Sequence, residues 1–140
     1  MEGQLKRFGV SLNSNLLKKF DSLIKKRGYA SRSEAIRDLI REKLIEEEWK
    51  NADSETVGVF SYIYDHHKPD LTAEINSIQH GHLELIRSSS HFHIDHNNCL
   101  EVVILDGRSG DIKRITDKLM SLKGIKHGRL IMTSRGDSID

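Results

Sequence analysis

The segment of residues 6–12 alternates polar and apolar residues, which predicts a short β-strand with one apolar face. Phe8, Val10 and Leu12 share that face. No other strand candidate occurs before residue 55. Because the backbone N–H and C=O groups of a strand need hydrogen-bond partners, we expect this strand to pair with another chain. The chain is therefore expected to fold as part of an assembly.

Two amphipathic helices are predicted after this strand. A cap at residues 13–14 and a stop at Gly28 bound the first, in which leucine, isoleucine and phenylalanine recur at helical spacing. Ser31 and Glu34 have the spacing of a capping box, which predicts a second helix running to about residue 50. The N-terminal module thus has the order strand, helix, helix.

The rest of the chain predicts a different architecture. Proline suits the first turn of its first helix, and β-branched runs mark its strands. The order is βαββαβ, the ferredoxin-like or split βαβ pattern. We therefore expect an α+β protein with domains at 1–50 and 51–140. The predicted elements are a strand at 57–64, a helix at 69–80, strands at 83–94 and 99–105, a turn at 106–110, a helix at 112–122 and a strand at 125–133.

Charge and histidine content differ between the two halves. Residues 1–50 hold 12 Lys/Arg and 8 Asp/Glu, whereas residues 51–140 hold 10 and 13. All eight histidines lie after residue 65. The first half favours a polyanion, and the second is rich in metal ligands. No apolar run is long enough for a membrane span and no secretion signal is seen, so we expect a cytoplasmic chain in which the lone cysteine is free, buried or ligating.

The N-terminal module resembles the ribbon-helix-helix repressors, of which Arc and MetJ are the type cases. In such a module, two strands form an antiparallel ribbon that fits the major groove of DNA. Arg7, Gly9 and Ser11 would then face the bases, and Ser31 and Arg37 would contact phosphate. A helical hairpin with a solvated edge strand is the alternative. Antitoxins share the module, but they carry a disordered toxin-binding tail where this chain has a patterned domain.

Residues 91–99, with the sequence HFHIDHNNC, carry the strongest chemical signal. On a strand, His91 and His93 project from the same face, roughly 6–7 Å apart. A turn at residues 95–98 would bring Cys99 close to them. A fourth ligand is nearest in the segment Gln79-His80-Gly81-His82. Three imidazoles and one thiolate suit Zn²⁺, Cu²⁺ or Ni²⁺, so the residues alone predict a borderline transition metal.

Taken together, these motifs resemble the family of nickel-responsive transcriptional regulators. The resemblance covers nearly the whole chain, in order and without large gaps. It rests on the ribbon-helix-helix start, Arg-Ser-Glu-Ala-Ile-Arg-Asp at 32–38, Gln79-His80-x-His82, His91-x-His93 and Cys99-Leu100-Glu101.

This resemblance implies a homotetramer in which ACT-like domains form the core between two DNA-binding modules. It implies one Ni²⁺ per chain in a square plane, held by His91, His93 and Cys99 of one chain and His80 of its neighbour. Nickel binding would favour a form that binds a double-stranded operator and represses nickel-uptake genes. Gly9 departs from the Thr or Ser common in the family. The resemblance assigns Tyr64, Gln79 and Glu101 to positions beside the ligands, and Glu34 and Asp38 to a second cation, K⁺, between the domains.

Outside the predicted ligand set, His66 follows the 57–64 strand and is the best candidate for accessory nickel. An enzyme is not expected, because four protein ligands would close the site and no HExxH motif occurs. The alternative function is a ribbon-helix-helix regulator whose ACT-like domain senses another metal or an amino acid.

Overall fold

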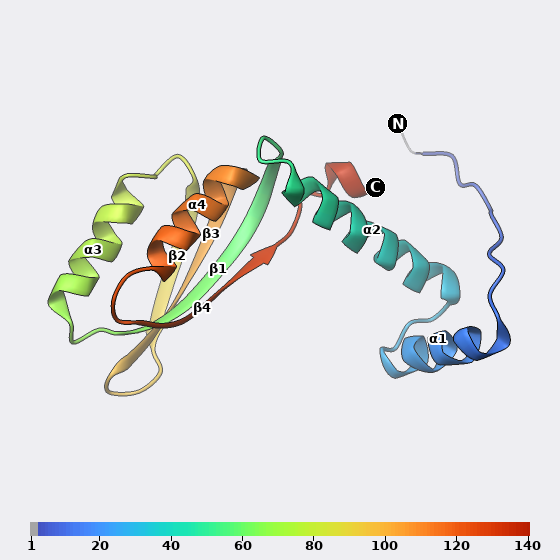
Figure 1. Cartoon of the computed structure of the whole chain (residues 1–140), viewed down its shortest axis with the longest axis horizontal. Helices are drawn as coiled ribbons and strands as arrows, with labels where there is room; N and C mark the ends of the chain where they lie inside the picture. Colours follow the sequence, from blue (N-terminus) through green and yellow to red (C-terminus); the bar gives the residue numbers. More distant parts are fainter. Residues whose placement is uncertain (1–2) are drawn as a thin grey trace.

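The computed structural model describes residues 3–140. The N-terminal helices are α1 (Ser14–Lys26) and α2 (Arg32–Lys50). None of the helices in this range has the length and apolarity needed to cross a membrane. The following elements run in the predicted order βαββαβ (Figure 1). They are β1 (Glu55–Asp65), α3 (Pro69–His80), β2 (Ile86–His93), β3 (Asn98–Arg108), α4 (Ser109–Met120) and β4 (Ile125–Met132), with a final short 3₁₀ helix, η1 (Asp137–Ile139).

Capping side chains set the ends of the N-terminal helices as predicted. The Asn13 side chain accepts a hydrogen bond from the Leu16 N–H at 2.8 Å, and the Ser31 hydroxyl accepts one from the Glu34 N–H at 3.2 Å. Gly28, with φ of 81°, ends the first helix region in the left-handed conformation that glycine adopts freely. Residues 3–13 form no strand within this single chain. Pairing of residues 6–12 with a second chain stays a prediction.

The sheet has the strand order β2-β3-β1-β4, and every neighbouring pair is antiparallel. Helices α3 and α4 contribute to one core with the sheet face that carries Tyr62 and Val103. On the opposite face, Phe92, Ile104 and Ile131 are 39–56% exposed. The domain is therefore a two-layer structure with one covered and one open sheet face.

One prediction about this region was wrong. Residues 106–110 do not form a turn, because β3 continues to Arg108 and α4 begins at the next residue. The strand continues because Asp106, Gly107 and Arg108 pair with the first residues of β1. A side chain at Gly107 would collide with Leu85, which explains glycine in a regular strand. Residues 83–85 likewise lie outside β2, which starts at Ile86.

The last turn of α2 is built into the sheet domain. Trp49 is 2% exposed and belongs to the core, and its indole N–H donates to the Thr133 carbonyl at 2.8 Å. The turn after α2 is tied to the start of α4, where Ser109 donates to the Asn51 carbonyl at 2.7 Å. Helix α2 therefore extends without interruption from the sheet domain to the segment that follows α1 (Figure 1).

Candidate metal centre

A thiol and two imidazoles meet at one end of the sheet. The Sγ atom of Cys99 lies 3.1 Å from Nδ1 of His93 and 3.4 Å from Nδ1 of His66. One ligand atom from each residue lies within 4.8 Å of the other two. Across residues 3–140, no other group of three or more His, Cys, Asp or Glu side chains is close enough to hold a metal ion. Two predicted ligands, His93 and Cys99, and the predicted accessory residue His66 thus form one candidate centre.

Strand register creates this cluster. His93 is the last residue of β2 and stands opposite Cys99, near the start of β3. Cys99 also pairs with Tyr64 of β1, so the residues that follow β1 reach the same end of the sheet. The His66 N–H donates to the Asn97 carbonyl at 3.3 Å, which holds His66 beside the turn between β2 and β3.

The other two predicted ligands do not join the cluster within one chain. His91 stands opposite Glu101, on the same sheet face as His93, and the two imidazole centroids are 6.4 Å apart. His80 is the last residue of α3. Both side chains are exposed, and both therefore remain accessible to another molecule.

The donor set suits a transition metal. Burial raises the pKa of the Cys99 thiol, and Glu101 adds to the effect, so a metal ion must displace a proton from this buried sulfur. Burial lowers the pKa of His66, helped by the neighbouring His67 and His93, which keeps the lone pair of its imidazole free. Thiolate and imidazole are ligands that borderline metals such as Ni²⁺ and Zn²⁺ prefer.

A buried carboxylate network lies directly beside this centre. The Glu101 carboxylate accepts hydrogen bonds from the Tyr62 hydroxyl at 2.5 Å, the Gln79 amide at 2.8 Å and the Ser89 hydroxyl at 2.5 Å. The Gln79 amide also donates to the Tyr62 hydroxyl at 3.0 Å. Burial and the hydrogen bond to Glu101 raise the pKa of Tyr62, which therefore stays a neutral donor. The network links α3, β1, β2 and β3, and joins the residue before His80 to the strand that carries Cys99.

Sequence reasoning named only part of this network. Glu101 and Gln79 were predicted beside the ligands, as was Tyr64, whose pKa is raised by burial and by the nearby Glu101 and Cys99. Tyr62 and Ser89 were missed. Alternation along residues 57–64 gave a usable signal for Tyr62, because it shares a face with Tyr64.

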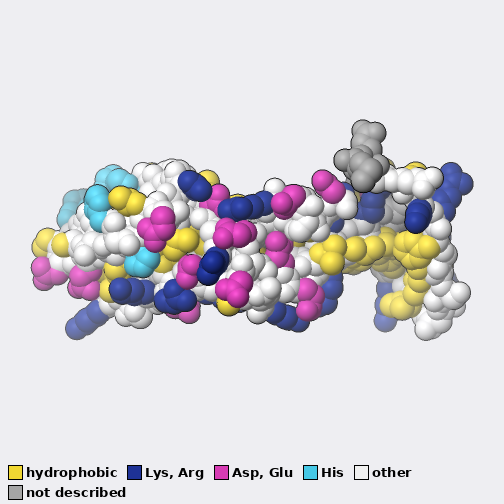
Figure 2. Space-filling view, turned by 90° about the horizontal axis from the view of Figure 1, so that it is seen from above, with side chains coloured by type: hydrophobic (Ala, Val, Ile, Leu, Met, Phe, Trp, Pro, Cys, Tyr) yellow, Lys and Arg dark blue, Asp and Glu magenta, His cyan; other side chains and the backbone are white. Residues whose placement is uncertain are grey.

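Figure 2 shows histidine side chains gathered at one end of an elongated molecule and hydrophobic side chains exposed at the other end. The hydrophobic end is the N-terminal module. The predicted DNA-contacting residues lie in this module, where Arg7, Gly9 and Ser11 are exposed in the extended segment, Ser31 caps α2 and Arg37 is exposed on α2. The apolar side chains are about half exposed, and they include Leu16, Leu23, Leu39, Ile40 and Leu44.

The residues predicted to hold a second cation lie on the first turns of α2. The Asp38 carboxylate accepts a hydrogen bond from the Tyr29 hydroxyl at 2.8 Å and lies 3.6 Å from the Arg41 guanidinium. Glu34 is exposed one turn earlier. A cation at Asp38 would therefore share this carboxylate with Tyr29 and Arg41.

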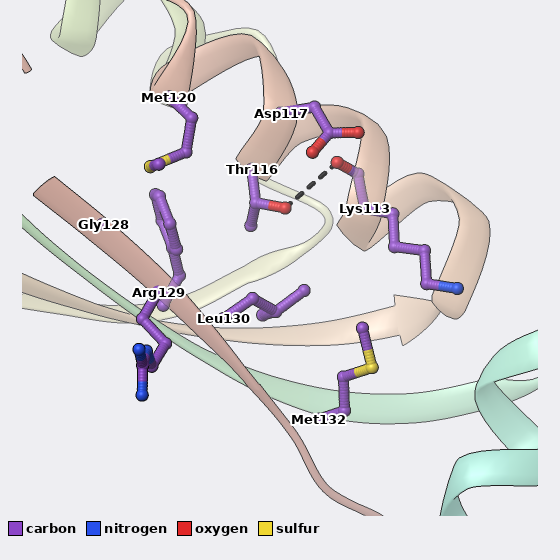
Figure 3. A pocket seen from close by; sticks show the side chains of 9 residues that line it. Lys113, Thr116, Asp117, Met120, Gly128, Arg129, Leu130 and Met132 are labelled. Carbon is purple, nitrogen blue, oxygen red and sulfur yellow. Dashed lines mark hydrogen bonds between the residues drawn. The ribbon is translucent and has the colours of Figure 1, made fainter.

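A groove of about 310 Å³ lies between α4 and β4 (Figure 3). Two of its polar side chains already have hydrogen-bond partners, because the Lys113 ammonium donates to the Trp49 carbonyl at 2.7 Å and Thr116 donates to the Lys113 carbonyl at 3.0 Å. Its apolar lining includes Met120, Leu130 and Met132. The groove is at the opposite edge of the sheet from His93, since β4 and β2 are the two edge strands. It plays no part in the metal centre.

Two protein-family models match this chain. Ribbon-helix-helix protein, copG family, matches residues 6–47. NikR C terminal nickel binding domain matches residues 57–133. The two matches flank the last turn of α2 and the turn that follows it.

Relatives from bacteria and archaea align over nearly the whole chain. A protein of Nitratidesulfovibrio vulgaris is 49% identical over 137 residues, covering 98% of this chain and 99% of its own length. A protein of Pyrococcus furiosus is 49% identical over 133 residues, covering 95% and 96%. One of Geobacter sulfurreducens is 47% identical, covering 98% and 99%. All three are assigned as nickel-responsive regulators.

The fold also occurs without close sequence similarity. An uncharacterized protein of Thermotoga maritima superimposes with a TM-score of 0.51 at 13% identity, covering 55% of this chain and 95% of the other. At this identity the likeness concerns the fold alone.

Proposed function

Because this chain belongs to the family of nickel-responsive regulators, we propose that it is a DNA-binding repressor of nickel-uptake genes whose affinity for its operator is raised by Ni²⁺. The observation that carries the proposal is the meeting of Cys99, His93 and His66 at one end of the sheet. The family is one of regulators and not of enzymes, in agreement with the sequence-based expectation.

We propose that His91, His93 and Cys99 hold one Ni²⁺ per chain together with His80 of a second copy. Exposure of His91 and His80 supports a site between chains, because neither joins the cluster inside one chain. His66 is an accessory ligand, since its Nδ1 atom lies as close to the Cys99 thiol as a sulfur hydrogen bond requires. When bound, nickel supplies a positive charge that stabilises the Cys99 thiolate.

The assembly proposed is a homotetramer built from two dimers. Two separate apolar surfaces support it, since each kind of contact in such a tetramer needs its own surface. One is the half-exposed face of α1 and α2, and the other is the open sheet face with Phe92, Ile104 and Ile131. The N-terminal segments would pair as a ribbon across the first surface.

The DNA contacts proposed are made by the paired N-terminal segments. Arg7 can donate two hydrogen bonds to guanine, Ser11 can bond several base edges, and Gly9 permits close approach of the backbone. Ser31 at the start of α2 and the exposed Arg37 would contact phosphates. Exposure of all five residues in the single chain supports this assignment.

Coupling between metal and DNA is proposed to run through α2. The helix carries Ser31 at one end and the buried Trp49 at the other, and the turn after it is bonded to α4. A shift of the sheet domains within the tetramer therefore moves the DNA-binding module as a rigid body. A K⁺ ion at Glu34 and Asp38 would fix the angle between module and core.

The test is an operator-binding assay with and without Ni²⁺, on duplexes selected from a random-sequence library by the nickel-loaded protein. We expect Ni²⁺ to strengthen binding and to produce a thiolate-to-nickel charge-transfer band that Cys99→Ala abolishes. Arg7→Ala should weaken specific binding by about 1–3 kcal/mol. A band that survives Cys99→Ala, or DNA affinity that responds to an amino acid and not to Ni²⁺, would refute the proposal.

A further inference from the structure

The turn between β2 and β3 directly connects two ligands of the metal centre, whose donor atoms lie 3.1 Å apart. His93 precedes it and Cys99 follows Asn98, and the two face each other across the hairpin. The Ile94 N–H donates to the Asn98 carbonyl at 2.8 Å, which closes the turn. The conformation of these few residues therefore sets the separation of the His93 imidazole and the Cys99 thiol.

One carboxylate organises this turn. The Oδ1 atom of Asp95 accepts hydrogen bonds from the Asn97 N–H at 2.9 Å, the Asn98 N–H at 2.8 Å and the Asn98 amide at 3.1 Å. Its Oδ2 atom accepts from the same Asn98 amide at 2.9 Å. Aspartate bonding to backbone N–H groups two and three residues ahead stabilises the turn in addition to the backbone hydrogen bond from Ile94 to Asn98.

The ordered turn also holds residues that directly follow β1 and one residue at the start of β4. The Asn97 carbonyl accepts from the His66 N–H at 3.3 Å, and the Asn98 side-chain carbonyl accepts from the Lys126 ammonium at 2.5 Å. The His96 carbonyl lies 2.8 Å from Nε2 of His67. The end of β1 and the start of β4 are thereby attached to the same turn, and His66 is held against Cys99.

We propose that Asp95 is the positioning residue of the metal centre: its carboxylate fixes the turn that places His93, Cys99 and His66 at ligand distance before any metal arrives. Asp95 itself contacts none of the three ligand atoms. The inference rests on the proposed function, because it assumes that the cluster binds Ni²⁺. Groups that orient metal ligands in this way contribute about 10- to 100-fold to metal affinity.

The experiment compares Ni²⁺ titrations of the full-length wild type, Asp95→Ala and Asp95→Asn, read by the thiolate-to-nickel band. We expect Asp95→Ala to bind Ni²⁺ about 10- to 100-fold more weakly and to shift the wavelength of the band. Asp95→Asn should recover most of the affinity, because its amide oxygen still accepts from the Asn97 and Asn98 N–H groups. Asp53→Ala is the matched control, since it removes one exposed carboxylate at the other end of β1 and should change neither readout.

Each outcome has a distinct meaning. A wild type without the band overturns the proposed function rather than the role of Asp95. A normal wild type with an unchanged Asp95→Ala variant overturns the positioning role. Equal losses in Asp95→Ala and Asp95→Asn overturn it too, because they would make the negative charge decisive. Should circular dichroism show Asp95→Ala to be unfolded, Asp95→Ser replaces it under the same criteria, since its hydroxyl keeps one acceptor in the turn.

Discussion

The two halves of this chain bury their apolar residues to very different extents. In the sheet domain, Tyr62 and Ile112 are completely buried and Phe60 is 1% exposed. In the N-terminal module, Leu39 and Ile40 remain 51% and 47% exposed. The sheet domain therefore completes its own core, whereas the N-terminal module has an apolar face that the single chain leaves uncovered. Stability of the single chain should accordingly come from one half and DNA recognition from the other.

The largest effect on stability is expected at the joint between the halves. Trp49→Ala should lower the free energy of unfolding by about 3–5 kcal/mol, because it removes a buried aromatic ring and the hydrogen bond to the Thr133 carbonyl. Urea denaturation at a fixed protein concentration measures this. Trp49→Phe should cost less, since it keeps most of the packing. A loss below about 1 kcal/mol in Trp49→Ala would mean that the sheet domain is stable without α2.

A large effect on DNA binding is expected at the exposed apolar face of the N-terminal module. Ile40→Lys should weaken operator binding by about 100-fold or more, because the charge would be buried when two N-terminal modules associate. It should leave the nickel band and the unfolding of the sheet domain unchanged, since Ile40 is 47% exposed in the single chain. A DNA-binding assay measures the loss of operator affinity, and nickel titration and urea denaturation check the two unchanged properties. Glu42→Lys, another exposed α2 position, is the control for the added charge.

How far the sequence predicted the structure also differs between the halves. Capping residues and periodicity located every helix longer than one turn and every strand of the sheet, because these signals act within a few residues. A strand at residues 6–12 was predicted but does not form in the single chain. Its predicted hydrogen-bond partners lie in a second chain, so this pairing stays a prediction. The strand at residues 98–108 was predicted too short, because Gly107 was read as part of a turn. Glycine is needed there because a side chain would collide with Leu85, and no local sequence pattern reveals this contact.

In the metal centre too, contacts between residues close in sequence could be predicted, and contacts between distant strands could not. His93 and Cys99 were predicted to be close because both flank one short turn, and the structure brings them within 3.1 Å. The approach of His66 depends on the register of β1 against β3, which sequence spacing does not give. Ser89 was missed beside Glu101 for the same reason, since its contact crosses between strands.

A medium effect is expected at the carboxylate network. Glu101→Gln should lower the free energy of unfolding by about 1–3 kcal/mol, because its new amide would face the donating amide of Gln79 in a buried site. Thermal unfolding of the metal-free protein measures this, with the exposed Glu84→Gln as the control for the lost charge. Equal stability of the two variants would show that the network contributes no stability to the sheet domain.

The smallest effect concerns two ion pairs, one in each half. The hydrogen bond from Arg135 lowers the pKa of Asp106 below its usual value, with Arg87 contributing. The hydrogen bond from Arg32 likewise lowers the pKa of Asp21. A carboxyl group with a lowered folded-state pKa stabilises the fold above its unfolded pKa, and this stability is lost as pH falls through the folded-state value.

Arg135→Ala should therefore lower the urea midpoint slightly near pH 7, and the difference from wild type should shrink below about pH 4. Arg32→Ala should leave the unfolding curve unchanged at every pH, because Asp21 and Arg32 are 41% and 57% exposed and belong to the module that adds little to single-chain stability. Urea midpoints measured between pH 3 and pH 7 compare the two variants. Equal pH-dependent losses in both would contradict the view that the stability of one chain comes from its sheet domain.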